Sequence, residues 1–321
     1  MIETLRNAWK LPELRKKLMF TALVLLLYRI GNVIPVPYVD VDALKTMFDT
    51  VLGETILGLY NAMSGSAFSQ ATVLALSIQP YINASIIIQL LTVAIPALER
   101  MAKEEGEEGK KKINIITRCS TVGLGLIMGW AFYSMLNSYG IITKTGFLPG
   151  LVIVLAFTAG SAVVMWLGEQ INEFGIGNGI SMILFANIIS GLPSGLSRML
   201  SMGWWAILVA IVMLALVLFI IFVNDAERRI PIQYAKRVVG RKIYGGQSTN
   251  LPIKVSMSGV MPVIFAQSIC SFPATICAFF GITSQSGKWW FDVFFSNTSW
   301  FYAFVYFIMI FFFGWFYAAI Q

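Results

Sequence analysis

The sequence contains no histidine and very little charge. Among its 321 residues, 12% are Asp, Glu, Lys or Arg and 57% are apolar, whereas about 25% of the residues in a typical soluble protein are charged. A chain with so few charges cannot cover a water-facing surface, so we expect lipid to be its main solvent. The absence of histidine removes His-dependent catalysis and the commonest protein ligand for metals.

Catalytic and cofactor motifs are also missing from the sequence. The three cysteines, Cys119, Cys270 and Cys277, form no CxxC pair, and we interpret them as packing residues in helices. There is no HExxH motif, and the apolar runs hold no pair of acidic residues that could serve an intramembrane protease. The glycines of 175–179 lack the full nucleotide-binding fingerprint, so we interpret them as a loop. The sequence therefore predicts no enzyme activity, no cofactor and no metal site.

Long apolar runs are what the sequence does contain. A helix needs about 20 mainly apolar residues to cross the hydrocarbon core, and the clearest candidate, 204–223, has no charged residue. We therefore predict an all-α polytopic membrane protein with about eight spans. The predicted spans lie near residues 18–34, 72–95, 113–136, 148–167, 180–193, 203–223, 256–280 and 299–320.

The basic residues are distributed unevenly between these runs. Eighteen of the 23 Lys and Arg residues lie before the first span, between the second and third spans, or between the sixth and seventh spans. Cytoplasmic loops of membrane proteins are enriched in Lys and Arg. The distribution predicts a cytoplasmic N-terminus and places the even-numbered loops in the cytoplasm.

The stretch 58–70 does not fit a simple bundle of spans, because it is too polar to face lipid and too short to cross it. Non-helical backbone at membrane depth occurs only against protein or a water-filled cavity. The stretch is therefore either an amphipathic helix at the interface or a short helix folded back into a cavity as a stopper. In the span that follows, Pro80 predicts a kink. Uncharged polar residues of that span fit either helix packing or a pore wall: Asn83, Ser85 and Gln89.

The sequence resembles the SecY family of protein-translocation channels in three long stretches, 58–91, 173–193 and 229–265. Their order and spacing match the family through nearly the whole chain. The resemblance implies a clamshell of two pseudo-symmetric, inverted helix halves, here 1–193 and 194–321. The family has ten spans, so the resemblance implies that about eight of the ten are present here and that the last two are not.

The resemblance also implies roles for particular residues. An apolar ring would close the pore, polar residues would line a lateral gate towards lipid, a plug within about 58–71 would block the pore at rest, and a basic loop at about 224–255 would dock partners. The implied pore ring is Ile78, Ile82, Ile180, Leu184 and Ile264; the plug segment, residues 61–70, is Asn61, Ala62, Met63, Ser64, Gly65, Ser66, Ala67, Phe68, Ser69 and Gln70; the lateral gate is Ser85, Gln89, Gln267 and Ser268; and the partner-binding residues are Lys236, Arg237, Arg241 and Lys242.

A bacterial plasma-membrane location and a set of partners follow from the same resemblance. The implied partners are the small subunits SecE and SecG, the SecA motor ATPase, the ribosome, signal sequences, unfolded secretory polypeptides and membrane lipid. Two other functions stay open on the residues alone. A secondary transporter is disfavoured by the scarcity of charge in the apolar runs, and an insertase without a through-pore would differ by its lack of ion conductance.

Overall fold

The computed structural model describes residues 11–52, 56–103, 106–232, 237–239, 242–244, 249–254, 259, 261–279, 293–294 and 299–320. These residues form two compact units. The first unit comprises Met1–Pro193 with Gln267–Tyr306, and the second comprises Ser194–Ala266 with Phe307–Gln321. The division of the chain into inverted halves at residue 193 stays a prediction.

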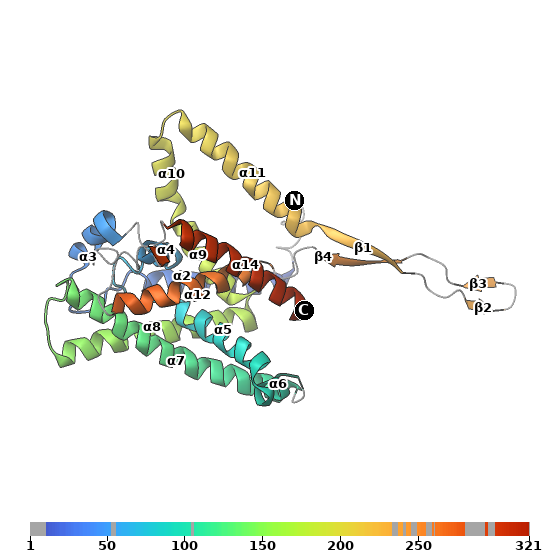
Figure 1. Cartoon of the computed structure of the whole chain (residues 1–321), viewed down its shortest axis with the longest axis horizontal. Helices are drawn as coiled ribbons and strands as arrows, with labels where there is room; N and C mark the ends of the chain where they lie inside the picture. The colour runs from blue at the N-terminus through green and yellow to red at the C-terminus, as the bar shows by residue number, and fades with distance from the viewer. Residues whose placement is uncertain are drawn as a thin grey trace. The chain divides into compact units, whose positions relative to one another are not determined.

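The first unit is a bundle of helices in which α8 (Phe147–Phe174) is central. Helices α2, α5, α7 and α9 all pack against α8 (Figure 1). Glycine permits two of the close approaches to α8: a Cβ on Gly179 of α9 would overlap the carbonyl oxygen of Gly168 on α8, and a Cβ on Gly160 of α8 would overlap that of Val73 in the turns before α5. The helices of this unit are α2 (Pro12–Gly31), α3 (Val41–Met47), a π-helix (Phe48–Leu52), α4 (Ile56–Met63), α5 (Gln79–Ala94), α6 (Pro96–Lys103), α7 (Gly106–Ser138), α8 and α9 (Gly179–Ser190).

The helix of the second predicted span begins later than the sequence predicted. Residues 72–78 are largely turns, and α5 begins at Gln79 with Pro80 in its first turn. Proline is well accommodated there, since the N–H that it lacks would have no partner within the helix. The predicted kink at Pro80 is therefore wrong. The chain bends instead by 106° between α5 and α6, where Pro96 follows the extended residue Ile95.

The connections between successive helices alternate between the two ends of this bundle. At one end Val39, after α2, forms a β-bridge with Ile142, after α7. At the other end of α8 the backbone N–H of Ile176 donates to Thr21 Oγ1 in the middle of α2, at 3.1 Å. Because Ile142 precedes α8 and Ile176 follows it, these successive connections lie at opposite ends of that helix, as expected for helices that cross a membrane in alternating directions.

The second unit contains α11 (Trp205–Asp225) and a β-ribbon. Strand β1 (Glu227–Ile232) pairs antiparallel with β4 (Thr249–Lys254), and β2 (Arg237–Val239) pairs with β3 (Lys242–Tyr244) in the segment between them (Figure 1). The strands lie within the basic loop at about 224–255. Helices α10 (Leu192–Ser201), α12 (Met261–Phe279) and α14 (Trp300–Ile320) each contribute residues to both units.

Within the described residues, five helices are long and apolar enough to cross a membrane, or six if α5 and α6 form one broken span. The five are α7, α8, α9 continued through α10, α11 and α14. The other two predicted spans coincide with α2, which carries charged residues in its first turns, and with α12, whose described apolar stretch is shorter. The fold is that of an all-α polytopic membrane protein.

Candidate functional site

The plug segment begins within α4 and continues as irregular turns inside the first unit. Only residues 61–63 are helical, so the predicted short helix covers a small part of the segment. Ser64, Ala67, Phe68 and Ser69 are all buried. This burial favours a segment folded back among the helices over an amphipathic helix at the membrane interface.

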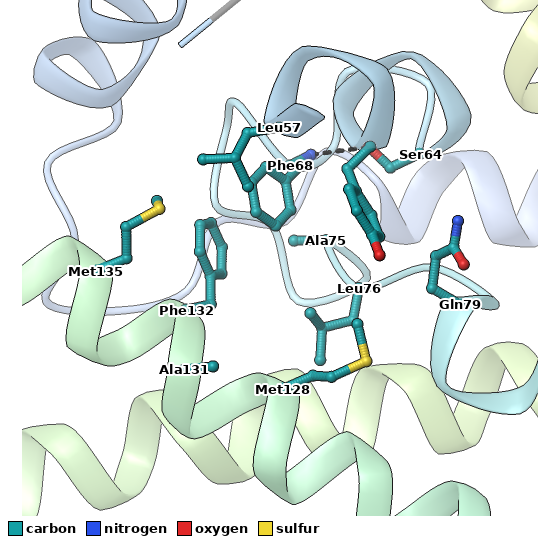
Figure 2. Close-up of a pocket in the computed structure, with 11 residues that line it drawn as sticks. Leu57, Ser64, Phe68, Ala75, Leu76, Gln79, Met128, Ala131, Phe132 and Met135 are labelled. Carbon is teal, nitrogen blue, oxygen red and sulfur yellow. Dashed lines mark hydrogen bonds between the residues drawn. The ribbon is translucent and has the colours of Figure 1, made fainter. Parts of the chain in front are cut away.

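The plug segment pairs part of its own irregular backbone. The backbone carbonyl of Asn61 accepts from the Ser66 N–H at 2.8 Å, and the Asn61 side-chain oxygen Oδ1 accepts from the Ser69 N–H at 2.9 Å. Ser64 Oγ accepts from the Phe68 N–H at 3.1 Å, as drawn in Figure 2. Buried backbone groups must be paired somewhere, and here short polar side chains supply the partners that a helix would have supplied.

One side of the plug segment is apolar and aromatic. The Phe68 ring stacks on Phe132 of α7 with ring centroids 4.0 Å apart, and Phe132 in turn contacts Phe157 of α8 at 4.9 Å. Phe48 meets Phe68 edge-on at 5.7 Å. A pocket beside this stack lies between the plug segment, the following turns and α7 (Figure 2). Its lining residues are Leu57, Tyr60, Ser64, Phe68, Ala75, Leu76, Gln79, Met128, Ala131, Phe132 and Met135.

The other side of the plug segment is polar and faces α9 and α2. Asn187 of α9, which is fully buried, donates from Nδ2 to the Met63 carbonyl oxygen at 2.8 Å and to Ser77 Oγ at 3.2 Å. Ser77 Oγ also lies 3.1 Å from the buried hydroxyl of Tyr28 on α2. These three residues were not predicted. The available signal was the presence of uncharged polar side chains within apolar spans, the same signal that singled out Asn83 and Gln89.

Gly65 of the plug segment lies against side chains of α2 and α9. Its φ of +66° suits glycine. A Cβ at this position would lie 3.0 Å from both Asn187 Oδ1 and Arg29 Nη1, and 2.9 Å from Ser190 Oγ. Any larger residue would strain the backbone and require the turn or these side chains to shift.

Four of the predicted pore-ring residues lie in the first unit. Ile78, Ile82 and Leu184 are buried, and Ile180 is half-buried. A Cβ added to Gly168 of α8 would lie 3.5 Å from Ile78 Cδ1, which places Ile78 against α8. The fifth residue, Ile264, is half-buried in the second unit. The ring therefore stays a prediction, since the described contacts do not join its members.

The predicted lateral-gate and docking residues lie on α5, α12 and the β-ribbon. Ser85 and Gln89 are half-buried on α5, Gln267 is half-buried on α12, and Ser268 is buried on α12. For docking, Arg237 lies in β2 opposite Tyr244, and Lys242 lies in β3 opposite Val239. The other two docking candidates, Lys236 and Arg241, lie outside the described residues.

The helices and the enclosed plug segment define a polytopic membrane protein that holds irregular backbone within a helix bundle. The SecY family profile matches residues 72–321. A protein translocase subunit SecY of Streptomyces scabiei is 42% identical over the whole chain, which covers 77% of that relative. The chain belongs to the SecY family.

Two solved structures have a similar fold. Sec61 in the canine ribosome–channel complex from the endoplasmic reticulum matches with a TM-score of 0.58 and 19% identity over 84% of this chain. A SecY structure in which the plug domain stabilises the closed translocation channel matches with a TM-score of 0.55 and 18% identity over 84% of this chain. The chain spans 59% and 58% of those two solved chains.

Proposed function

We propose that this chain is the pore-forming subunit of a protein-conducting channel in a bacterial plasma membrane. The channel passes unfolded secretory polypeptides across the membrane and releases apolar segments sideways into lipid. The observation that carries the proposal is the buried plug segment, because irregular backbone at membrane depth requires surrounding protein or a water-filled path. The name of the Streptomyces relative, a protein translocase subunit, supports the same function.

The proposed seal of the pore is apolar. A narrow apolar constriction resists wetting and so blocks ions and water, while branched aliphatic side chains make no hydrogen bonds that would trap a passing chain. The burial of Ile78, Ile82 and Leu184 supports their place at such a constriction. The proposed ring is completed by Ile180 and Ile264.

The proposed lateral gate lies between α5 and α12. Ser85 and Gln89 would line one side, and Gln267 and Ser268 the other. A signal sequence that leaves the pore through this seam would gain about 25 cal/mol for each Å² of apolar surface removed from water. The support is the presence of uncharged polar side chains at half-buried or buried positions of otherwise apolar helices.

The proposed docking surface is the basic β-ribbon of the second unit. Docking of cytoplasmic partners there requires the ribbon, and with it the N-terminus, to lie in the cytoplasm. Arg237 and Lys242 lie on paired strands, and Lys236 and Arg241 complete the proposed set. Cations there suit ribosomal RNA phosphates, whose binding weakens steeply with salt, and acidic patches on a SecA motor. The canine structure, a Sec61 chain in a ribosome complex, supports the ribosome as a partner. The small subunits SecE and SecG complete the proposed assembly.

The proposed function needs no catalytic step in this chain, since the driving energy comes from a bound motor or from the ribosome. Single-channel conductance in a planar bilayer tests it, with the channel complex compared before and after deletion of 61–70. We expect the intact channel to stay closed at rest and the deletion to conduct ions. A deletion of 143–146, four exposed loop residues after α7, is the matched control and should stay closed. If neither the intact channel nor the 61–70 deletion conducts, the channel proposal fails.

A further inference from the structure

A chain of hydrogen bonds joins four segments of the first unit behind the plug segment. It runs from Tyr28 of α2 to Ser77 in the turns before α5, then to Asn187 of α9 and the Met63 carbonyl at the end of α4. The three side chains are 0%, 2% and 0% exposed, respectively. Of the four members, only Met63 belongs to the plug segment, so the bond from Asn187 is where this chain meets the plug.

The orientation of the Asn187 amide is fixed by what surrounds it. A side-chain amide has two N–H groups and one oxygen, and here one N–H goes to the Met63 carbonyl and the other to the Ser77 hydroxyl. A flipped amide would point its oxygen at the Met63 carbonyl, which cannot donate. The Met63 carbonyl therefore selects this orientation, and the Ser77 hydroxyl gives the same Asn187 nitrogen a second partner.

Asn187 Oδ1 has no hydrogen-bond partner among the described residues. It lies beside Gly65, where a Cβ would be 3.0 Å from Asn187 Oδ1. A buried polar atom without a partner weakens the site as a whole. The contact between α9 and the plug segment thus combines a good hydrogen bond with an unpaired acceptor, which suits a contact that has to break and form again.

We propose that Asn187 is a positioning residue that latches the plug segment in the closed channel, with Ser77 and Tyr28 holding the latch in place. This inference rests on the proposed channel function. Displacing the plug segment breaks the bond from Asn187 to the Met63 carbonyl and leaves the bonds among Asn187, Ser77 and Tyr28 intact. The latch therefore sets how often the resting channel opens without being part of the pore itself.

The test measures how often a buried plug residue becomes accessible. Ala67, which is 1% exposed, is replaced by cysteine in a complex whose three native cysteines are replaced by alanine. Its rate of labelling by a membrane-impermeant maleimide then reports the open fraction. For Asn187→Leu we expect the rate to rise about fivefold, the effect of losing one net hydrogen bond of about 1 kcal/mol. For Ser77→Ala and Tyr28→Phe, which only loosen the latch, we expect about twofold or less.

A double variant distinguishes a latch from general loosening. If Ser77 acts through Asn187, Asn187→Leu with Ser77→Ala should label no faster than Asn187→Leu alone, a non-additive result expected only for coupled residues. The matched control is Ser161→Ala, which removes a buried hydroxyl of α8 that bonds within its own helix, to the Thr158 carbonyl. Its labelling rate should equal that of the unmodified channel.

The outcomes separate the latch from the channel. Unchanged labelling in Asn187→Leu, together with a conducting 61–70 deletion, overturns the latch and leaves the channel proposal standing. Equal increases in Ser161→Ala and Ser77→Ala also overturn the latch. A 61–70 deletion that does not conduct overturns the channel proposal, whatever the labelling rates are.

Discussion

The turns at 64–78 and helix α11 occupy environments opposite to those that they would have in a water-soluble protein. The turns are irregular and rich in Ser and Thr, yet Thr72 is 0% exposed and Ser77 is 2% exposed. Helix α11 is almost wholly apolar, yet Leu214 is 65% exposed. The difference follows from the backbone, because α11 satisfies its own hydrogen bonds and can face lipid, whereas the turns cannot.

The same contrast shows what stabilises each region. Helix α11 needs little from the rest of the protein, since transfer of its apolar side chains into lipid is favourable by itself. The turns depend on contacts supplied from elsewhere, such as the Phe132 ring on one side and Asn187 on the other. Substitutions should therefore have large effects near the turns when they remove packing, and large effects in α11 only when they add charge.

The largest expected effect comes from truncating an aromatic residue of the enclosed stack. Phe157→Ala, at a position that is 0% exposed, should lower the free energy of unfolding by about 3 to 5 kcal/mol, the usual range for a buried phenylalanine. Unfolding in mixed micelles by a denaturing detergent measures the change. The matched control is Phe219→Ala on α11, where the side chain faces lipid and the loss should be below about 1 kcal/mol. Equal losses at the two sites would remove the contrast between the regions.

A charge added to α11 should have the next largest effect. Leu214 lies near the middle of this helix, and Leu214→Arg should make membrane insertion less favourable by about 2.5 to 3.5 kcal/mol. Protease protection after synthesis in the presence of membrane vesicles measures the inserted fraction. Ile230→Arg in β1, which is exposed in the ribbon, is the control and should insert normally. Normal insertion of Leu214→Arg would mean that α11 does not face lipid.

A methyl group added to a glycine of α8 should test how closely the turns pack against this helix. Gly160 of α8 lies directly against the carbonyl oxygen of Val73 in the turns, so that a Cβ would overlap it. Gly160→Ala should therefore cost about 1 to 3 kcal/mol of stability through overpacking. Gly123 of α7 has open space at the Cβ position, so Gly123→Ala should be neutral or slightly stabilising. Thermal unfolding in detergent of both variants checks the difference, and an unchanged Gly160→Ala would contradict the close packing of turns on α8.

Much of the fold was predictable, because most helices of the membrane region correspond to long apolar runs in the sequence. The second span was predicted to begin at residue 72, but its helix begins at residue 79. The prediction was wrong because residues 72–78 are apolar enough to resemble a helix, whereas their backbone forms turns, with a φ of +50° at Ser77. Hydropathy does not distinguish an apolar turn from an apolar helix. Proline at position 80 was the better signal, since proline fits the first turn of a helix.

The position of the plug segment was only partly predictable. Its polarity excluded lipid and its length excluded a span, which left the protein interior or the interface. Its partners were not predictable, because Asn187 and Met63 are 124 positions apart in the sequence. A polar residue in an apolar span indicates that it has a partner but not which one.

Several hydrogen bonds of the plug segment lie within the segment itself. Asn61 holds the backbone of Ser66 and Ser69, and Ser64 holds that of Phe68, all within ten residues. A loop that relied on the surrounding helices for these bonds would expose bare backbone whenever it moved. In the proposed channel this segment can leave and return with those bonds intact, so opening need not involve its complete unfolding.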